Sequence, residues 1–215
     1  MFKDSKAPKN GFSLIELLIV LFVFTFVMGG IFNVLVRSQN RYRFEQDVAE
    51  AQQMARNSIE LMEREIRLAG FPQSSYYDSS NNWSATNSTK VARYFLDCTN
   101  PDTGTTLSSS QMLFEGDIDE DGVVESVRYR LNGTDLERSV EDKTSGSTPS
   151  AVYRVIARNV TALTLSYLTA TGTTTTNSSL VRAVRIQLTL TTNQRDPESR
   201  KFRNVSIETT ALARN

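Results

Sequence analysis

The hydrophobic positions of this 215-residue chain first form one continuous run. Residues 12–36 contain a single charged side chain, Glu16. Because about 20 apolar residues in a helix cross a hydrocarbon core of roughly 30 Å, the run predicts a membrane-spanning helix. A removable secretory signal is the competing interpretation, but the run is longer than the usual signal core and no A-x-A cleavage site follows it. Basic residues flank both ends of the run, so the positive-inside rule leaves its orientation open.

A second pattern begins at Phe44, where apolar residues recur at intervals of three and four. This spacing is one stripe of an amphipathic α-helix. The stripe consists of Phe44, Val48, Ala51, Ala55, Ile59, Met62, Ile66 and Ala69. No proline interrupts residues 12–69, and Gly70 followed by Pro72 predicts the end of the helix. One helix of roughly 87 Å is therefore expected, with the pair Gly29 and Gly30 as its weak point at about 1 kcal/mol each.

A third pattern follows Pro72, where short segments of alternating hydrophobicity are separated by turn residues. The predicted strands are Val91–Cys98, Met112–Phe114, Val123–Leu131, Thr134–Val140, Val152–Tyr167, Val181–Thr191 and Lys201–Ala211. The strand over 152–167 is long enough for two strands, or for one with a break near Asn159. Asn132-Gly133 predicts a type I′ hairpin. The chain is thus expected to be an α+β protein in which a long N-terminal helix packs on a mainly antiparallel sheet.

Composition narrows the classes of function. The chain has no histidine, a single cysteine (Cys98), and 24 basic against 24 acidic residues, with an isoelectric point near 6.4. These counts exclude histidine-based triads, histidine-ligated zinc and internal disulfides. Cys98 is expected to be a small buried residue in a strand rather than a reactive thiol. Without a basic stripe, nucleic-acid binding is not expected, and an enzyme is the less favoured class.

The junction between the basic leader and the apolar run carries a family resemblance. Residues 9–20 read KNGFSLIELLIV, and they resemble the class III signal of type IV prepilins and type II secretion pseudopilins. The resemblance implies cleavage between Gly11 and Phe12 by a prepilin peptidase and N-methylation of Phe12 by its methyltransferase activity. It also implies a single-pass protein of the bacterial inner membrane with a cytoplasmic N-terminus, later found in the pilus, at the cell surface or in the periplasm.

Glu16 fits this resemblance on physical grounds. A carboxylate at the centre of a membrane span costs roughly 2.5–3.5 kcal/mol on insertion scales, so it tends to be paired. The resemblance implies an assembly role in which Glu16 pairs with the α-amine of Phe12 in a neighbouring subunit. An acid close enough to the membrane edge to reach water is the alternative.

The family resemblance also implies an organisation of the chain. Residues 1–11 are a leader peptide, 12–36 the half of the helix that lies in the membrane or the filament core, and 37–71 the amphipathic half. Residues 72–215 are expected to form the antiparallel β-sheet domain. Pilins of this family have a ladle shape, with the N-terminal helix as the handle.

The end of the predicted helix suggests a subgroup. Residues 55–71, and more weakly the ending 212–215, are similar to PilW-type minor pilins. This similarity implies a minor type IV pilin that takes part in pilus assembly or initiation, with the major pilin and other minor pilins as partners. A J-like minor pseudopilin of type II secretion is one alternative. A pilus-displayed adhesin or DNA-uptake component is another, with the aromatic loop of Tyr76, Tyr77 and Trp83 or an acidic loop as its binding site.

That acidic loop, Asp117-Ile118-Asp119-Glu120-Asp121-Gly122, fits the pattern D-x-D-x-D-G and resembles the first half of an EF-hand. Alternate carboxylates converge on a cation in such loops, and Glu125 and the carbonyl of Val123 are further candidate ligands for Ca²⁺. The bidentate glutamate of a true EF-hand is replaced by Arg128, and a strand pattern follows instead of a helix. A full EF-hand is not expected, and a solvated acidic turn is the alternative to a calcium site. No cofactor is otherwise required.

Overall fold

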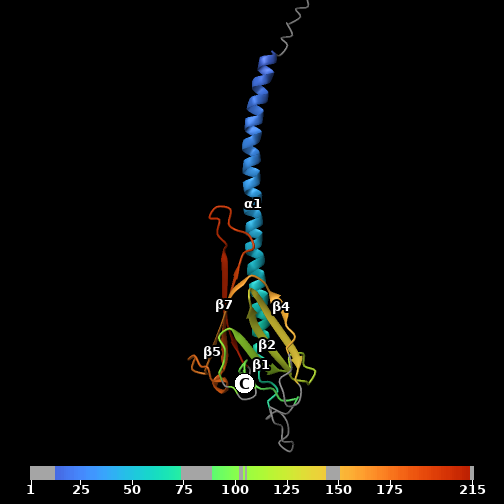
Figure 1. The fold of residues 1–215 in the computed structure, drawn as a ribbon, viewed down its shortest axis with the longest axis vertical. Coiled ribbons are helices and arrows are strands. Elements are labelled where there is room, and N and C mark those ends of the chain that lie inside the picture. Colours follow the sequence, from blue (N-terminus) through green and yellow to red (C-terminus); the bar gives the residue numbers. More distant parts are fainter. Residues whose placement is uncertain (1–12, 74–88, 102–103, 105, 144–150, 214–215) are drawn as a thin grey trace, which may run out of the picture.

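A computed structural model describes residues 13–73, 89–101, 104, 106–143 and 151–213 of the chain. One long helix and two antiparallel sheets make up the fold, with both sheets around the C-terminal half of the helix (Figure 1). The elements in chain order are α1 Leu14–Ile66, β1 Gln111–Gly116, β2 Glu125–Asn132, β3 Asp135–Asp142, β4 Arg154–Ala157, β5 Val160–Leu168, the short 3₁₀ helix η2 Ser178–Leu180, β6 Ala183–Thr191 and β7 Asn204–Leu212. The predicted α+β architecture is confirmed.

Helix α1 runs without a break for 53 residues, which corresponds to roughly 80 Å. Every member of the predicted apolar stripe is buried. The helix continues through Gly29 and Gly30, where an added Cβ would meet no other atom within 4 Å. It ends at Ile66, a few residues before the predicted stop, and residues 67–70 form turns. Gly70 has the expected left-handed conformation, with φ of 75°, and its amide donates to the carbonyl of Glu115 at 2.7 Å.

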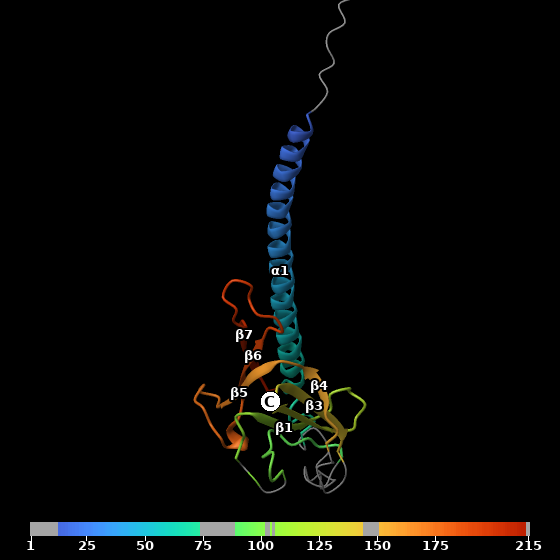
Figure 2. The same cartoon turned by 45° about the horizontal axis from the view of Figure 1, so that its top comes forward.

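The predicted antiparallel sheet is divided into two sheets. The first has the strand order β1-β2-β3-β4 and the second the order β5-β6-β7, and every pairing is antiparallel. The division falls between β4 and β5, where Asn159 adopts a φ of 57°, so the break expected near this residue is confirmed. In both views the two sheets lie on either side of α1 (Figures 1 and 2).

The predicted strand Val91–Cys98 is wrong. Only Leu96 pairs with a neighbour, in an isolated bridge to Leu113 of β1. The backbone amide of Arg93 explains the difference. It donates to the buried side-chain carboxylate of Glu115 at 2.9 Å rather than to a backbone carbonyl of a neighbouring strand. The amide of Ala92 likewise donates to the carbonyl of Pro72. This segment therefore runs along the β1 edge of the first sheet as an irregular chain.

The hairpin between β2 and β3 forms as predicted, but its turn differs. Asn132 pairs with Asp135, so Gly133 and Thr134 are the two central residues of the turn. Gly133 has a φ of 61°, whereas Thr134 has no positive φ. A type I′ turn needs a positive φ at both positions, which a β-branched threonine resists, so the turn belongs to type II′ with glycine first.

The core lies between the two sheets and the C-terminal half of α1. The strand β6 buries Val184, Ile186, Leu188 and Leu190 as its alternation predicts. Helix α1 packs against β7, β6 and β4. A smaller apolar cluster joins Phe44, Val48 and Ala51 of α1 to Val205 of β7. The packed part of the helix therefore begins at Phe44, and the part before it lies outside the domain.

Candidate functional site: the exposed half of the helix and the acidic loop

The N-terminal half of α1 buries none of its side chains within the described chain, although Arg41 Nη1 lies 3.7 Å from Glu198 Oε1 in an exposed ion pair with the connection between β6 and β7. Every residue from 13 to 43 is exposed, and the large apolar side chains between Leu14 and Val36 are between 38% and 81% exposed. An 18-residue window of this helix has a mean hydropathy of 2.6 and no buried residue, which suits a membrane-spanning helix by length and composition. Each such side chain gains roughly 1.5–3 kcal/mol on full burial. The sum is on the order of tens of kcal/mol, more than the stability of a typical domain. Such a surface is suited to burial in a membrane or against another apolar partner.

Glu16 lies in the first turn of α1. Ser13 is the N-cap, and its carbonyl accepts from the amides of Glu16 at 3.0 Å and Leu17 at 3.2 Å. The Glu16 side chain is exposed, and it forms no ion pair with any residue that the structure describes. An acid in the first turn is favoured by the helix dipole. Gly11 and Phe12 lie outside the described residues, so their roles in cleavage and methylation stay predictions, as does the assembly role of Glu16.

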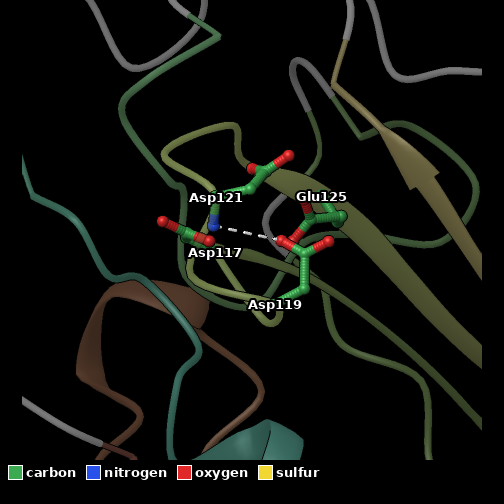
Figure 3. Close-up of side chains that lie close together, drawn as sticks. All are labelled: Asp117, Asp119, Asp121 and Glu125. Atoms are coloured by element: carbon green, nitrogen blue, oxygen red, sulfur yellow. Dashed lines mark hydrogen bonds between the residues drawn. The ribbon is translucent and has the colours of Figure 1, made fainter.

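The acidic loop joins β1 to β2 and brings four carboxylates together. One oxygen from each of Asp117, Asp119, Asp121 and Glu125 lies within 4.8 Å of the corresponding oxygens of the other three. Figure 3 shows these side chains around one point, with Asp117 and Asp121 on one side and Asp119 and Glu125 on the other. Asp117 and Glu125 are buried, whereas Asp119 and Asp121 are exposed. The structure thus assembles the residues that the sequence pattern singled out.

Local hydrogen bonds hold this loop in shape. The amide of Gly122 donates to Asp117 Oδ2 at 3.1 Å, and the amide of Val123 donates to Asp121 Oδ1 at 2.7 Å. The amide of Ile118 donates to Glu125 Oε2 at 2.8 Å. Gly122 has a φ of 86°, which only glycine adopts readily. The loop therefore turns back on itself and brings its four carboxylates close to one another.

The element that follows the loop is a strand. Arg128, at the position of the bidentate glutamate in an EF-hand, lies in β2 and pairs with Leu113 and Ser139. No helix follows the loop, so the expectation that a full EF-hand does not form is confirmed.

The cluster is strongly electronegative. No lysine or arginine in the described part of the chain forms an ion pair with any of its four carboxylates. Burial raises the pKa of Glu125 to about 7, and the negative charges of Asp119, Asp117 and Asp121 add to the increase. The hydrogen bond from Ile118 opposes this shift without cancelling it. Such a pKa reports the burial of the group and the negative charges beside it.

Two buried ionic networks were not predicted from the sequence. In the first, Glu65 of α1 is 2% exposed and accepts hydrogen bonds from the Tyr129 hydroxyl and from both Nε and Nη2 of Arg138. Burial and the adjacent Glu65 carboxylate raise the pKa of the Tyr129 hydroxyl. Since Tyr129 belongs to β2 and Arg138 to β3, this network joins the helix to the first sheet.

The second network centres on Glu115, whose side chain is fully buried in β1. Its carboxylate accepts from Lys143 Nζ at 2.7 Å and from Arg93 Nε at 2.9 Å. Lys143 also donates to the carbonyl of Val91 at 2.9 Å. The network fixes the irregular segment at 89–101 to the first sheet, and its position inside the core indicates a structural role.

The other candidate residues add no site. Cys98 is half-buried at a bend, so the expectation of a buried residue in a strand is wrong. Burial together with the charge of Asp97 raises the pKa of its thiol to about 11, which agrees with an unreactive residue. Tyr76, Tyr77 and Trp83, considered for a binding tip, lie outside the described residues.

Comparisons with known families agree with this geometry. Residues 45–210 match the family described as Prepilin peptidase-dependent protein B, and residues 6–32 match the Prokaryotic N-terminal methylation motif. A comparison with curated proteins found no match. The two family matches together cover most of the apolar run and nearly all of the packed half of α1 and of both sheets. The chain therefore belongs to the prepilin peptidase-dependent protein B family and is a minor pilin-type protein with a type IV pilin-like fold.

Proposed function

We propose that this chain is a minor type IV pilin of the PilW type that takes part in the assembly or initiation of a pilus. Before assembly it is held in the inner membrane by residues 12–36, with its N-terminus in the cytoplasm. A prepilin peptidase cleaves between Gly11 and Phe12, and Phe12 is then N-methylated. The processed subunit joins the major pilin and other minor pilins and is displayed in the pilus, at the cell surface or in the periplasm.

The exposed apolar half of α1 is the observation that carries this proposal. Most of it lies within the matched methylation motif, residues 6–32, and its large apolar side chains are exposed. The same surface suits two successive environments, first lipid and then the apolar helices of neighbouring subunits. Pilin-like families are structural proteins, and a scaffold whose main exposed feature is an uncovered helix agrees with a structural role.

Glu16 supplies the polar contact in this scheme. Cleavage after Gly11 creates a positive α-amine on Phe12, one helical turn from Glu16. In the apolar interior of a filament each of these charges lacks water, so an ion pair between neighbouring subunits offsets the cost of burying both. The proposed pairing gives each incoming subunit a defined axial position.

The test examines processing and assembly separately. The N-terminus of the membrane-bound chain is read by mass spectrometry, and we expect N-methylated Phe12 in the wild type and an intact leader in Gly11→Val. Glu16→Ala is expected to be cleaved normally but to be missing from sheared filaments. Glu50→Ala is a matched control, since Glu50 is an exposed acid further along the same helix. An unprocessed wild-type chain, or filaments that incorporate Glu16→Ala as well as Glu50→Ala, would overturn the proposal.

A deletion strain separates the pilus from the secretion alternative. Loss of pili or twitching motility with normal protein secretion supports the pilus role. Loss of secretion with normal pili would assign the chain to a type II system as a J-like pseudopilin and would contradict the pilus role.

A further inference from the structure

We propose that the loop between β1 and β2 binds one Ca²⁺ ion through the carboxylates of Asp117, Asp119, Asp121 and Glu125. The site lies in the sheet domain, far along the chain from Gly11 and Glu16, and neither family match assigns a ligand there. The proposal is therefore independent of the processing and assembly of the subunit.

The spacing of the oxygens agrees with a calcium ion. Ca²⁺ binds oxygens at about 2.3–2.6 Å, so two ligands on opposite sides of the ion are separated by about 4.6–5.2 Å. The four carboxylate oxygens all lie within 4.8 Å of one another, which is compatible with one such coordination sphere. Mg²⁺, with its ligands at about 2.0–2.1 Å, requires opposite oxygens to be within about 4.2 Å and holds to octahedral geometry. The larger and more tolerant ion fits the spacing of this cluster better.

Asp117 gives a second, independent indication of a ligand. The residue is 91% buried, since only 9% of its surface is exposed, and one of its carboxylate oxygens faces the other three side chains (Figure 3). Its Oδ2 accepts from the amide of Gly122, but its Oδ1 is buried and has no hydrogen-bond donor among the described residues. An unsatisfied buried acceptor costs about 1–3 kcal/mol, and more when it is charged. A cation bound by this carboxylate provides the missing favourable interaction.

The nature of the ligands restricts the ion to a hard cation. All four side chains offer carboxylate oxygen, and the chain contains no histidine. Oxygen-only sites select calcium or magnesium over zinc, copper and iron. The absence of any lysine or arginine ion pair to these four groups, within the described residues, leaves their negative charge available to a metal.

The cluster is accessible and closely attached to the rest of the domain. Asp119 and Glu125 line a cleft of about 1000 Å³ between the loop, the end of α1 and strands β3 and β7, through which an ion enters from solvent. The amide of Asp117 donates to the carbonyl of Phe71 at 3.0 Å, just after the helix. Bound Ca²⁺ is thus expected to stabilise the contact between this loop and the end of α1. Two ligands are exposed and the EF-hand glutamate is missing, so we expect the affinity of an extracellular module, with a Kd of about 10⁻⁴–10⁻³ M.

The experiment uses the full chain purified in detergent micelles and stripped of metal with a chelator. Isothermal titration is carried out with CaCl₂ and, separately, with MgCl₂. We expect one Ca²⁺ per chain and weaker binding of Mg²⁺. Asp119→Asn removes one exposed ligand charge with almost no change in shape and is expected to weaken Ca²⁺ binding by about ten-fold or more. Asp121→Asn is a second variant with the same expected loss.

Glu120→Gln is the matched control. Glu120 lies in the same loop and loses the same charge, but it does not belong to the cluster. The affinity of this variant for Ca²⁺ should remain within about two-fold of the wild type, because an exposed charge that is not a ligand acts only through screened electrostatics. Circular dichroism verifies that each variant is folded. Three outcomes would overturn the proposal: no binding heat with millimolar Ca²⁺, equal affinities in Asp119→Asn and the wild type, or tighter binding of Mg²⁺ than of Ca²⁺.

Discussion

Replacing Glu65 by alanine is expected to destabilise the domain far more than a typical helix substitution. The Glu65 carboxylate is 2% exposed and receives three hydrogen bonds, one from Tyr129 and two from Arg138. Alanine leaves the Tyr129 hydroxyl without an acceptor and the guanidinium of Arg138 without its counter-ion. Breaking a buried pair in this way costs about 3–5 kcal/mol, against a few tenths gained in helix propensity. We therefore expect the free energy of unfolding to fall by roughly 3–4 kcal/mol.

Tyr129→Phe measures how much of this loss comes from the hydrogen bond of the Tyr129 hydroxyl. It removes one hydrogen bond to a charged group, worth about 1.5–3 kcal/mol, but leaves Glu65 paired with Arg138. Glu60→Ala is the control, because Glu60 is exposed on the same helix, and its effect should stay within about 0.5 kcal/mol. Denaturant unfolding of the full chain in detergent, followed by near-ultraviolet circular dichroism, measures all three variants. If Glu65→Ala proves as stable as Glu60→Ala, the network contributes nothing to holding the helix on the sheet.

Two further predictions concern Cys98 and Gly133. With a thiol pKa near 11 instead of the ordinary 9.0, the thiolate fraction of Cys98 at pH 8 is about ninety-fold smaller. Alkylation should therefore be slower by about that factor in the folded chain than in denaturant, and equal rates in the two states would refute this. Gly133→Ala, at a φ of 61° with open space around the Cβ position, should cost about 1–2 kcal/mol through backbone strain alone. Denaturant unfolding tests it, and an unchanged stability would show that the turn relaxes without cost.

The helix was predictable because its burial depends on local spacing. The stripe from Phe44 to Ala69 needed only the 3.6-residue period, and the structure buries all of it. The same period also places Glu65 on the buried stripe, because Glu65 lies three residues after Met62. An acid in that position requires a buried partner. The sequence alone does not identify the partners, since Tyr129 and Arg138 are more than sixty positions away.

The errors in the β region arise from long-range contacts. Residues 91–98 have the composition of a strand, but Arg93 is bound by Glu115 from another part of the chain, and this competes with regular pairing. The division into two sheets depends on a backbone reversal at Asn159, which the sequence marked only as a break. The acidic loop was predicted correctly as a cluster because its four carboxylates lie within nine consecutive residues, 117–125. The burial of Asp117 was not predicted from the sequence, because it depends on contacts with the segment after α1.

Two buried acids fix the packed half of α1 to the domain at both ends. Near the start of the packed half, Asp47 accepts from Asn193 Nδ2 at 3.1 Å and from the amide of Gln194 at 2.8 Å, both in the connection between β6 and β7. Near its end, Glu65 is bound by β2 and β3 of the other sheet. Hydrogen bonds to a charge are directional and worth about 1.5–3 kcal/mol each, so the pair resists both rotation and sliding of the helix, which apolar packing alone resists less. The exposed half has no comparable contact within the described chain. A force applied to that half, by lipid or by neighbouring subunits, is consequently transmitted to both sheets, and the helix and domain move as one body.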